Sequence, residues 1–131
     1  MFNSLHEECG VFGIFENKTT YVAHSAYLAL YALQHRGQES CGIAVNDDGV
    51  FRHHRGDGLV PDVFTSEKLD TLGTGNMAIG HVRYSTTGGK SVNNIQPLVI
   101  RHIKGNLALA HNGNLVNAHD IRKTFELKGG I

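Results

Sequence analysis

The chain has 131 residues, of which 40% are hydrophobic and 18% charged, a composition typical of one folded domain and unlike that of a disordered segment. Twelve Lys and Arg residues balance 12 Asp and Glu residues, so the chain has no net field that would attract nucleic acid or an anionic membrane. The longest apolar stretch, 21–33, is too short to span a bilayer. The first ten residues lack the basic and apolar regions of a secretory signal, which predicts a cytoplasmic protein.

The first two predicted elements are a strand and a helix. Residues 9–15 alternate small and apolar side chains, which predicts a strand. Residues 21–35 predict an amphipathic helix, with Thr19 or Thr20 as its N-cap. The stripe expected to face the core consists of Ala23, Tyr27, Leu30 and Tyr31.

Most of the remaining chain predicts strands. Asp47-Asp48-Gly49 is a turn signal between two short β-rich runs and predicts a hairpin. Lys104-Gly105-Asn106 joins two further runs in the same way. The predicted strands are 41–46, 50–54, 77–84, 98–103 and 107–111.

The last predicted element is a helix that Asn114 caps and Gly129-Gly130 ends. Its apolar face carries Leu115, Ala118, Ile121 and Phe125. Together the elements predict an α+β fold with mostly antiparallel sheet. Because this helix stops almost at Ile131, we expect a domain that is truncated at its C-terminus.

Three polar strings, at 9–13, 80–86 and 111–115, lie at the edges of predicted strands and contain glycines that permit close approach of a ligand. A nucleophilic cysteine needs a base, donors for the oxyanion and a group that orients the substrate. Asn112-Gly113 offers a side-chain NH₂ and an unhindered backbone N–H, and Arg83 offers a planar fork suited to a carboxylate. The strings thus hold candidates for nucleophilic catalysis by Cys9.

Spacing alone leaves ordinary interpretations open for each of these residues. Cys9 also fits a buried thiol, Arg83 a structural ion pair, and Asn112-Gly113 a turn. Cys41 has no such polar surroundings and is expected to be a core thiol. The nine histidines show no metal-ligand spacing, so no metal site is expected in this segment.

Five ordered blocks extend over essentially the whole chain. They are CGVFG at 9–13, LQHRGQESCGI at 33–43, GHVRYSTTG at 80–88, NNIQPL at 93–98 and LALAHNGNLVNA at 107–118. With these blocks the sequence resembles the N-terminal glutaminase domain of class II glutamine amidotransferases, which are N-terminal-nucleophile hydrolases. The resemblance implies a four-layer α/β/β/α sandwich.

The resemblance also implies a catalytic arrangement. In this family an N-terminal cysteine cleaves the side-chain amide of glutamine, and its own α-amino group, with a pKa of about 7.7 to 8.0, serves as the base. That role falls on Cys9, so residues 1–8 are expected to be a leader that is removed and residues 9–131 an incomplete glutaminase domain.

The other implied roles concern the substrate. Arg83 and Thr86 would bind the α-carboxylate of glutamine, and Asn112 and Gly113 would form the oxyanion hole. Arg36 would lie in the loop beside the nucleophile. The family's acidic residue for the substrate's amino group would fall beyond the chain. We therefore expect this segment by itself, with its leader, to be inactive.

Within the family, the leader favours the branch that passes ammonia to phosphoribosyl pyrophosphate, forming 5-phosphoribosylamine in the first step of purine biosynthesis. The transferase domain, with its Mg²⁺, is expected on sequence outside this chain, where some leader-bearing relatives also hold an iron–sulfur cluster. A homo-oligomer is expected for the full-length protein. Two alternatives stay open: the glutaminase domain of another class II amidotransferase, which the acceptor domain would distinguish, or a silent, unprocessed binding or scaffold domain, which the mass of the N-terminus would distinguish.

Overall fold

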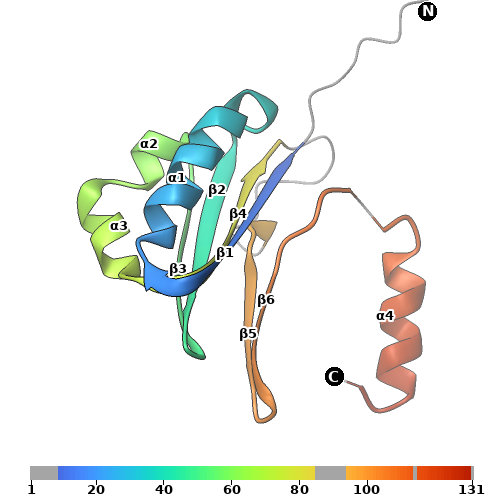
Figure 1. Ribbon diagram of the computed structural model, residues 1–131. Helices are drawn as coiled ribbons and strands as arrows, with labels where there is room; N and C mark the ends of the chain where they lie inside the picture. Colours follow the sequence, from blue (N-terminus) through green and yellow to red (C-terminus); the bar gives the residue numbers. More distant parts are fainter. Residues whose placement is uncertain (1–8, 85–93, 114, 131) are drawn as a thin grey trace, which may run out of the picture.

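The computed structural model describes residues 9–84, 94–113 and 115–130. Its middle consists of a four-stranded sheet of order β1-β4-β2-β3 and a two-stranded sheet, β5-β6, and all strand pairs within these sheets are antiparallel (Figure 1). The strands are β1 (Gly10–Thr20), β2 (Ser40–Asp47), β3 (Val50–Asp57), β4 (Gly75–Arg83), β5 (Leu98–His102) and β6 (Gly105–Leu109). The helices are α1 (Val22–Leu33), η1 (Gln34–Arg36, a 3₁₀ turn), α2 (Val60–Val63), α3 (Ser66–Leu72) and α4 (Ala118–Leu127).

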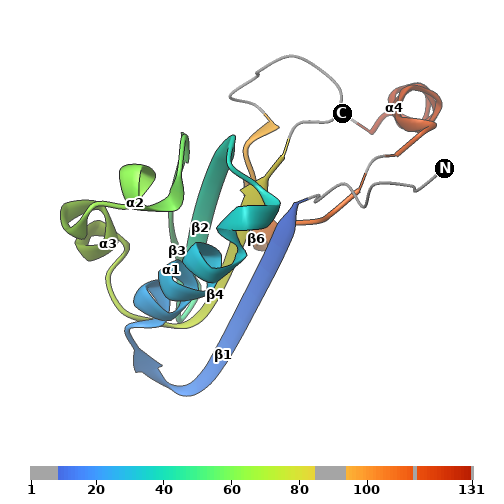
Figure 2. The ribbon, with the colours of Figure 1, turned by 90° about the horizontal axis from the view of Figure 1, so that it is seen from above.

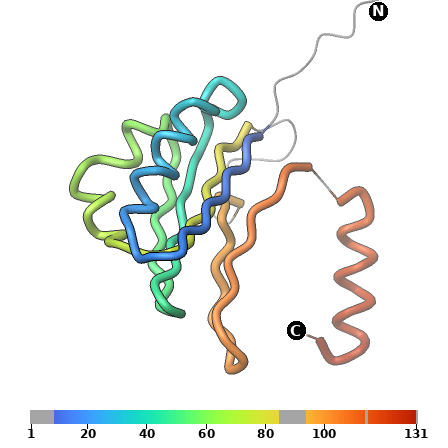
Figure 3. Tube along the Cα trace, viewed as in Figure 1, coloured from blue at the N-terminus to red at the C-terminus, as the bar shows by residue number. Residues whose placement is uncertain are grey.

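The elements lie in four layers. Helices α1, α2 and α3 cover one face of the large sheet, the β5–β6 hairpin lies on its other side, and α4 lies beyond the hairpin (Figures 1 and 2). The Cα trace shows the same order from α1 to α4 (Figure 3). The predicted α+β sandwich with α/β/β/α layers and antiparallel sheets is confirmed.

Helix α1 supplies much of the core, and the predicted stripe is confirmed in part. Ala23 and Leu30 are buried and Tyr27 packs against the core, whereas Tyr31 is 56% exposed. Val22 and Ala26 are buried in addition. The small alanines let the helix approach the sheet so closely that a Cβ on Gly80 would lie 3.0 Å from the Leu30 side chain. Large tyrosine rings do not fit in such a narrow space and remain towards solvent or at the edge of the core.

The predicted cap of α1 is wrong. Strand β1 continues through Thr20, and Tyr21 occupies the N-cap position without a side-chain hydrogen bond. A threonine inside a strand cannot adopt the N-cap position, because the helix starts only after the strand ends.

The first hairpin follows the sequence closely. Strands β2 and β3 pair from Ser40↔Asp57 to Asp47↔Val50, and the turn residues Asp48 and Gly49 both have positive φ, as a tight hairpin turn requires. In the second hairpin His102 pairs with Gly105, so the loop lies one residue earlier than predicted and Gly105 begins β6.

Cys41 lies in β2 and is 1% exposed, so its predicted place in the core is confirmed. Burial is the main cause that raises the pKa of its thiol to about 12, and the nearby charge of Asp62 adds to the shift. Cys41 is therefore protonated and inert at neutral pH.

Two short helices were not predicted. Thr65 caps α3 by accepting a hydrogen bond from the Lys68 N–H, and Leu69 and Leu72 are its buried side chains. Helix α2 has a proline in its first turn. Both are shorter than two and a half turns, which leaves too little periodicity to distinguish them from a loop.

Helix α4 begins later than predicted. Asn117 is its N-cap residue, and Asn114 lies outside the described residues. The predicted end is confirmed, since Gly129 has a φ of +75° and the Gly130 N–H donates to the Phe125 carbonyl. Phe125 is 62% exposed, so the apolar face of α4 is not covered by the described part of the chain. Within that part, every helix is too short or too polar to cross a membrane.

Candidate active site

Cys9 lies at one end of the large sheet, immediately before β1. The pairing Gly10↔Val82 brings it beside the last residues of β4. The Cys9 Sγ accepts a hydrogen bond from the backbone N–H of Tyr84 at 3.4 Å and lies 3.7 Å from the Tyr84 carbonyl oxygen. The side chain is partly exposed, unlike that of Cys41. The chain thus has one cysteine that a substrate can reach and one that is sealed in the core.

Two of the predicted site residues meet on the main chain of Cys9. The Asn112 side-chain amide donates to the Cys9 carbonyl oxygen at 2.8 Å, and the Arg36 Nε donates to the same oxygen at 3.4 Å. Both donors follow the cysteine in the chain, at separations of 103 and 27 residues. The sequence strings around 9, 36 and 112 therefore converge in space.

The Asn112–Gly113 segment presents donors without side-chain obstruction. The amide of Asn112 carries two N–H groups, so the bond to Cys9 leaves one for another acceptor. Gly113 has a φ of +112°, and a Cβ built there would meet no described atom within 4 Å. This backbone conformation favours glycine and leaves open space beside its peptide group.

Arg83 lies on the same face of β4 as His81, because side chains two residues apart in a strand share a face. That is the face towards Asn112 and the second sheet, since the His81 ring contacts the His111 carbonyl. Burial is the main cause that lowers the pKa of His81 to about 4, and the Arg83 charge adds to it. Arg83 is thus the last residue of β4, on this face and at the same end of the sheet as Cys9. Thr86, the other predicted carboxylate-binding residue, lies outside the described residues.

Arg36 is brought to the site by a close contact between backbones. A Cβ on Gly37 would lie 2.8 Å from backbone atoms of Arg83, and the Glu39 N–H donates to the Arg83 carbonyl at 3.1 Å. Only glycine allows this approach, which holds the η1 turn against the end of β4. The glycine next to Arg36 thus explains why a residue after α1 can reach Cys9.

Sequence reasoning missed the contacts that surround these residues. Tyr84 acts through its peptide group, and Gln96 and His81 bind the backbone of His111. All three lie inside or next to the recognised blocks. Their residue types carried no signal, because in each contact one of the two groups belongs to the main chain, which is the same for every residue type.

Comparison with known proteins agrees with this geometry. No protein-family model matches the chain. An amidophosphoribosyltransferase of Methanocaldococcus jannaschii is 51% identical over 123 residues, which are 94% of this chain and 26% of the relative. A solved structure described as the allosteric regulatory enzyme of purine biosynthesis is 45% identical with a TM-score of 0.80, covering 92% of this chain and 26% of the other. The Bacillus subtilis glutamine phosphoribosylpyrophosphate amidotransferase complexed with ADP and GMP is 43% identical with a TM-score of 0.75, covering 92% of this chain and 25% of the other.

The fold is that of the glutamine amidotransferase domain of the N-terminal-nucleophile type. The match covers nearly all of this chain but only about a quarter of the length of these amidophosphoribosyltransferases. Within this class, the chain corresponds in sequence and fold to the N-terminal quarter of the amidophosphoribosyltransferases.

Proposed function

We propose that this chain is the glutaminase part of an amidophosphoribosyltransferase. The observation that carries the proposal is the meeting of Asn112 and Arg36 on the carbonyl oxygen of Cys9, beside the partly exposed thiol. A structural cysteine would not need two polar side chains from distant segments at its main chain. A nucleophile does, because its sulfur must be held at a fixed angle to the substrate.

The reaction begins once residues 1–8 are removed. The free α-amino group of Cys9 takes the thiol proton, and the sulfur attacks the amide carbon of glutamine. The tetrahedral intermediate then collapses, its C–N bond breaks, and the proton passes from the ammonium group to the departing nitrogen, which leaves as ammonia. Water hydrolyses the remaining thioester to glutamate and regenerates the thiol.

The surrounding residues divide the work. The second N–H of Asn112 and the N–H of Gly113 stabilise the negative oxygen of the intermediate, a role that the contact of Asn112 with Cys9 and the open backbone at Gly113 support. Arg83 and Thr86 bind the α-carboxylate of glutamine. The positive charge of Arg83, on the same face of β4 as His81, supports this role. Arg36 orients the Cys9 carbonyl.

The rest of the reaction belongs to sequence outside this chain. There the ammonia would react with phosphoribosyl pyrophosphate to give 5-phosphoribosylamine, and Mg²⁺ would be required. An iron–sulfur cluster and a homo-oligomer stay predictions for the full-length protein. Two free cysteines suit a reducing compartment, which supports the cytosol.

Replacing Cys9 by alanine in the complete enzyme tests the proposal. Glutamine-dependent formation of phosphoribosylamine should fall to background, while added ammonia should still support it. Cys41→Ala is the matched control, since it removes the buried thiol and should leave glutamine hydrolysis intact. If Cys9→Ala retained glutamine-dependent turnover, or lost ammonia-dependent activity as well, the cysteine would not be the nucleophile of a separate glutaminase site.

A further inference from the structure

The peptide groups of His111 are held from two sides. Its N–H donates to the Gln96 side-chain oxygen at 2.6 Å, and its carbonyl oxygen lies 3.1 Å from the His81 Nε2. His111 directly precedes Asn112 and Gly113, whose own side chains or backbones are exposed. Together with the bond from Asn112 to the Cys9 carbonyl, this pair of hydrogen bonds restrains the segment that carries the oxyanion donors.

Gln96 itself stands on a fixed backbone. Arg55 reaches from β3 and donates to the Ile95 carbonyl at 2.7 Å and to the Pro97 carbonyl at 3.3 Å. A Cβ on Gly42 would overlap the Gln96 carbonyl oxygen, so the 95–97 segment lies directly on β2. The Gln96 side chain thus projects from a segment clamped to the large sheet.

His81 is fixed equally firmly. It is fully buried in the middle of the large sheet, between Val11 of β1 and Gly42 of β2. Its lowered pKa keeps the ring neutral at pH 7. Because a carbonyl oxygen can only accept, the single ring proton must lie on Nε2 and point at His111.

We propose that Gln96 and His81 are positioning residues for the oxyanion donors Asn112 and Gly113. Gln96 holds the N–H and His81 the carbonyl oxygen of His111, the residue that precedes the two donors. Neither residue is assigned a contact with the substrate. This inference rests on the proposed glutaminase function. Its physical basis is that transition-state donors must be held to within about 0.5 Å, and a misplacement of about 1 Å costs a factor of about 10² in rate.

Gln96 offers a matched pair of variants in the complete, processed enzyme. Gln96→Met has the same length and no acceptor, so it should lower kcat for glutamine hydrolysis about 10- to 100-fold with little change in KM, since the oxyanion forms only in the transition state. Gln96→Glu keeps an oxygen that accepts from the His111 N–H and should recover most of the rate. Asn46→Ala removes the same kind of bond, from a side-chain oxygen to a backbone N–H, at the far end of the sheet and should leave kcat unchanged.

His81 gives an independent pair. His81→Phe fills the space without a donor and should lower kcat, whereas His81→Gln restores an N–H at similar reach and should recover part of it. Ammonia-dependent activity reports whether each variant is folded and should stay at the wild-type level. Faster hydrogen exchange of the His111 amide in Gln96→Met, compared with Gln96→Glu, would show the loss of the restraint directly.

The outcomes separate the two proposals. If the wild-type enzyme did not hydrolyse glutamine, the proposed function would fail, and this inference with it. If the wild type hydrolysed glutamine and Gln96→Met kept its kcat, or Gln96→Glu lost as much as Gln96→Met, only the positioning role would be overturned. A rise in KM alone would instead assign Gln96 to substrate binding and also overturn it.

Discussion

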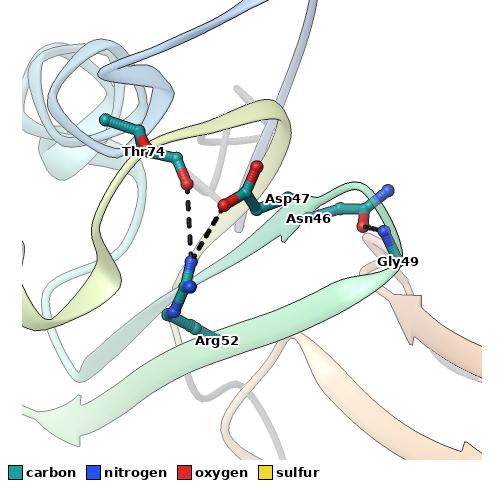
Figure 4. A network of polar contacts seen from close by, with 5 residues as sticks. All are labelled: Asn46, Asp47, Gly49, Arg52 and Thr74. Atoms are coloured by element: carbon teal, nitrogen blue, oxygen red, sulfur yellow. Dashed lines mark hydrogen bonds and ion pairs between the residues drawn. The ribbon is translucent and has the colours of Figure 1, made fainter.

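The two ends of the four-stranded sheet use polar side chains differently. At the far end, Asn46 accepts from the Gly49 N–H at 2.7 Å within its own turn (Figure 4). There Arg52 lies 3.6 Å from Asp47 and 3.5 Å from the Thr74 carbonyl oxygen. At the near end, Asn112 and Arg36 reach the main chain of Cys9 from segments far apart in sequence.

The polar contacts at the far end stabilise a local hairpin, whereas those at the near end join distant segments into a site. Bonds at the far end link mostly residues of one hairpin, which the turn already brings together. Bonds at the near end form only when β1, β4, η1 and the segment after β6 have all assembled. Substitutions at the near end should therefore affect turnover most, and substitutions at the far end should affect stability slightly and turnover not at all.

Asn112→Ala should give the largest effect of the three substitutions considered next. It removes a donor that the oxyanion requires, so kcat for glutamine should fall by about 10² to 10³. Steady-state kinetics of glutamate release in the processed enzyme measures it, with ammonia-dependent activity as the control for folding. A change in KM with an unaltered kcat would refute the oxyanion assignment.

Arg83→Lys should have an intermediate effect of a different kind. A lysine keeps the charge but loses the two-pronged fork, and the α-carboxylate is bound in the ground and transition states alike. KM for glutamine should rise while kcat changes little. Steady-state kinetics of glutamate release measures both constants. A loss confined to kcat would place Arg83 at the reacting amide and not at the carboxylate.

Arg52→Ala should have the smallest effect. Its ion pair with Asp47 is partly exposed, with side chains 39% and 29% accessible, so its loss should cost no more than about 1 kcal/mol. Thermal unfolding of the complete enzyme should show a small decrease in Tm, and glutamine turnover should equal that of the wild type. A large loss of turnover would mean that the two ends of the sheet are coupled.

The sequence predicted the strands and the first hairpin well because their signals are local. The Asp48-Gly49 turn needs positive φ, and the alternation of residues 9–15 needs only neighbouring positions. The buried stripe of α1 was predicted only in part: Ala23 and Leu30 are buried, but Tyr31 is exposed, because the helix packs closely over Gly80. That packing depends on a strand about 50 residues away.

The candidate site was predicted through resemblance, and geometry adds what residue type could not show. Cys9, Arg36 and Asn112 were named, and the structure brings them together. The supporting contacts of Gln96 and His81 escaped because both act on the peptide of His111. A main-chain partner leaves no pattern in the sequence that pairs the two residues.

The most direct test concerns the α-amino group of Cys9. Two forms of the complete enzyme, one with residues 1–8 and one beginning at Cys9, are assayed for glutamate release from glutamine. Only the form that begins at Cys9 should hydrolyse glutamine, and only its Cys9 should be alkylated rapidly near neutral pH by a glutamine-like electrophile, because the free amine then assists thiolate formation. Equal turnover by both forms would contradict the account. It would require a side-chain base, with His111 tested before His81, whose lowered pKa and buried ring suit it poorly for that role.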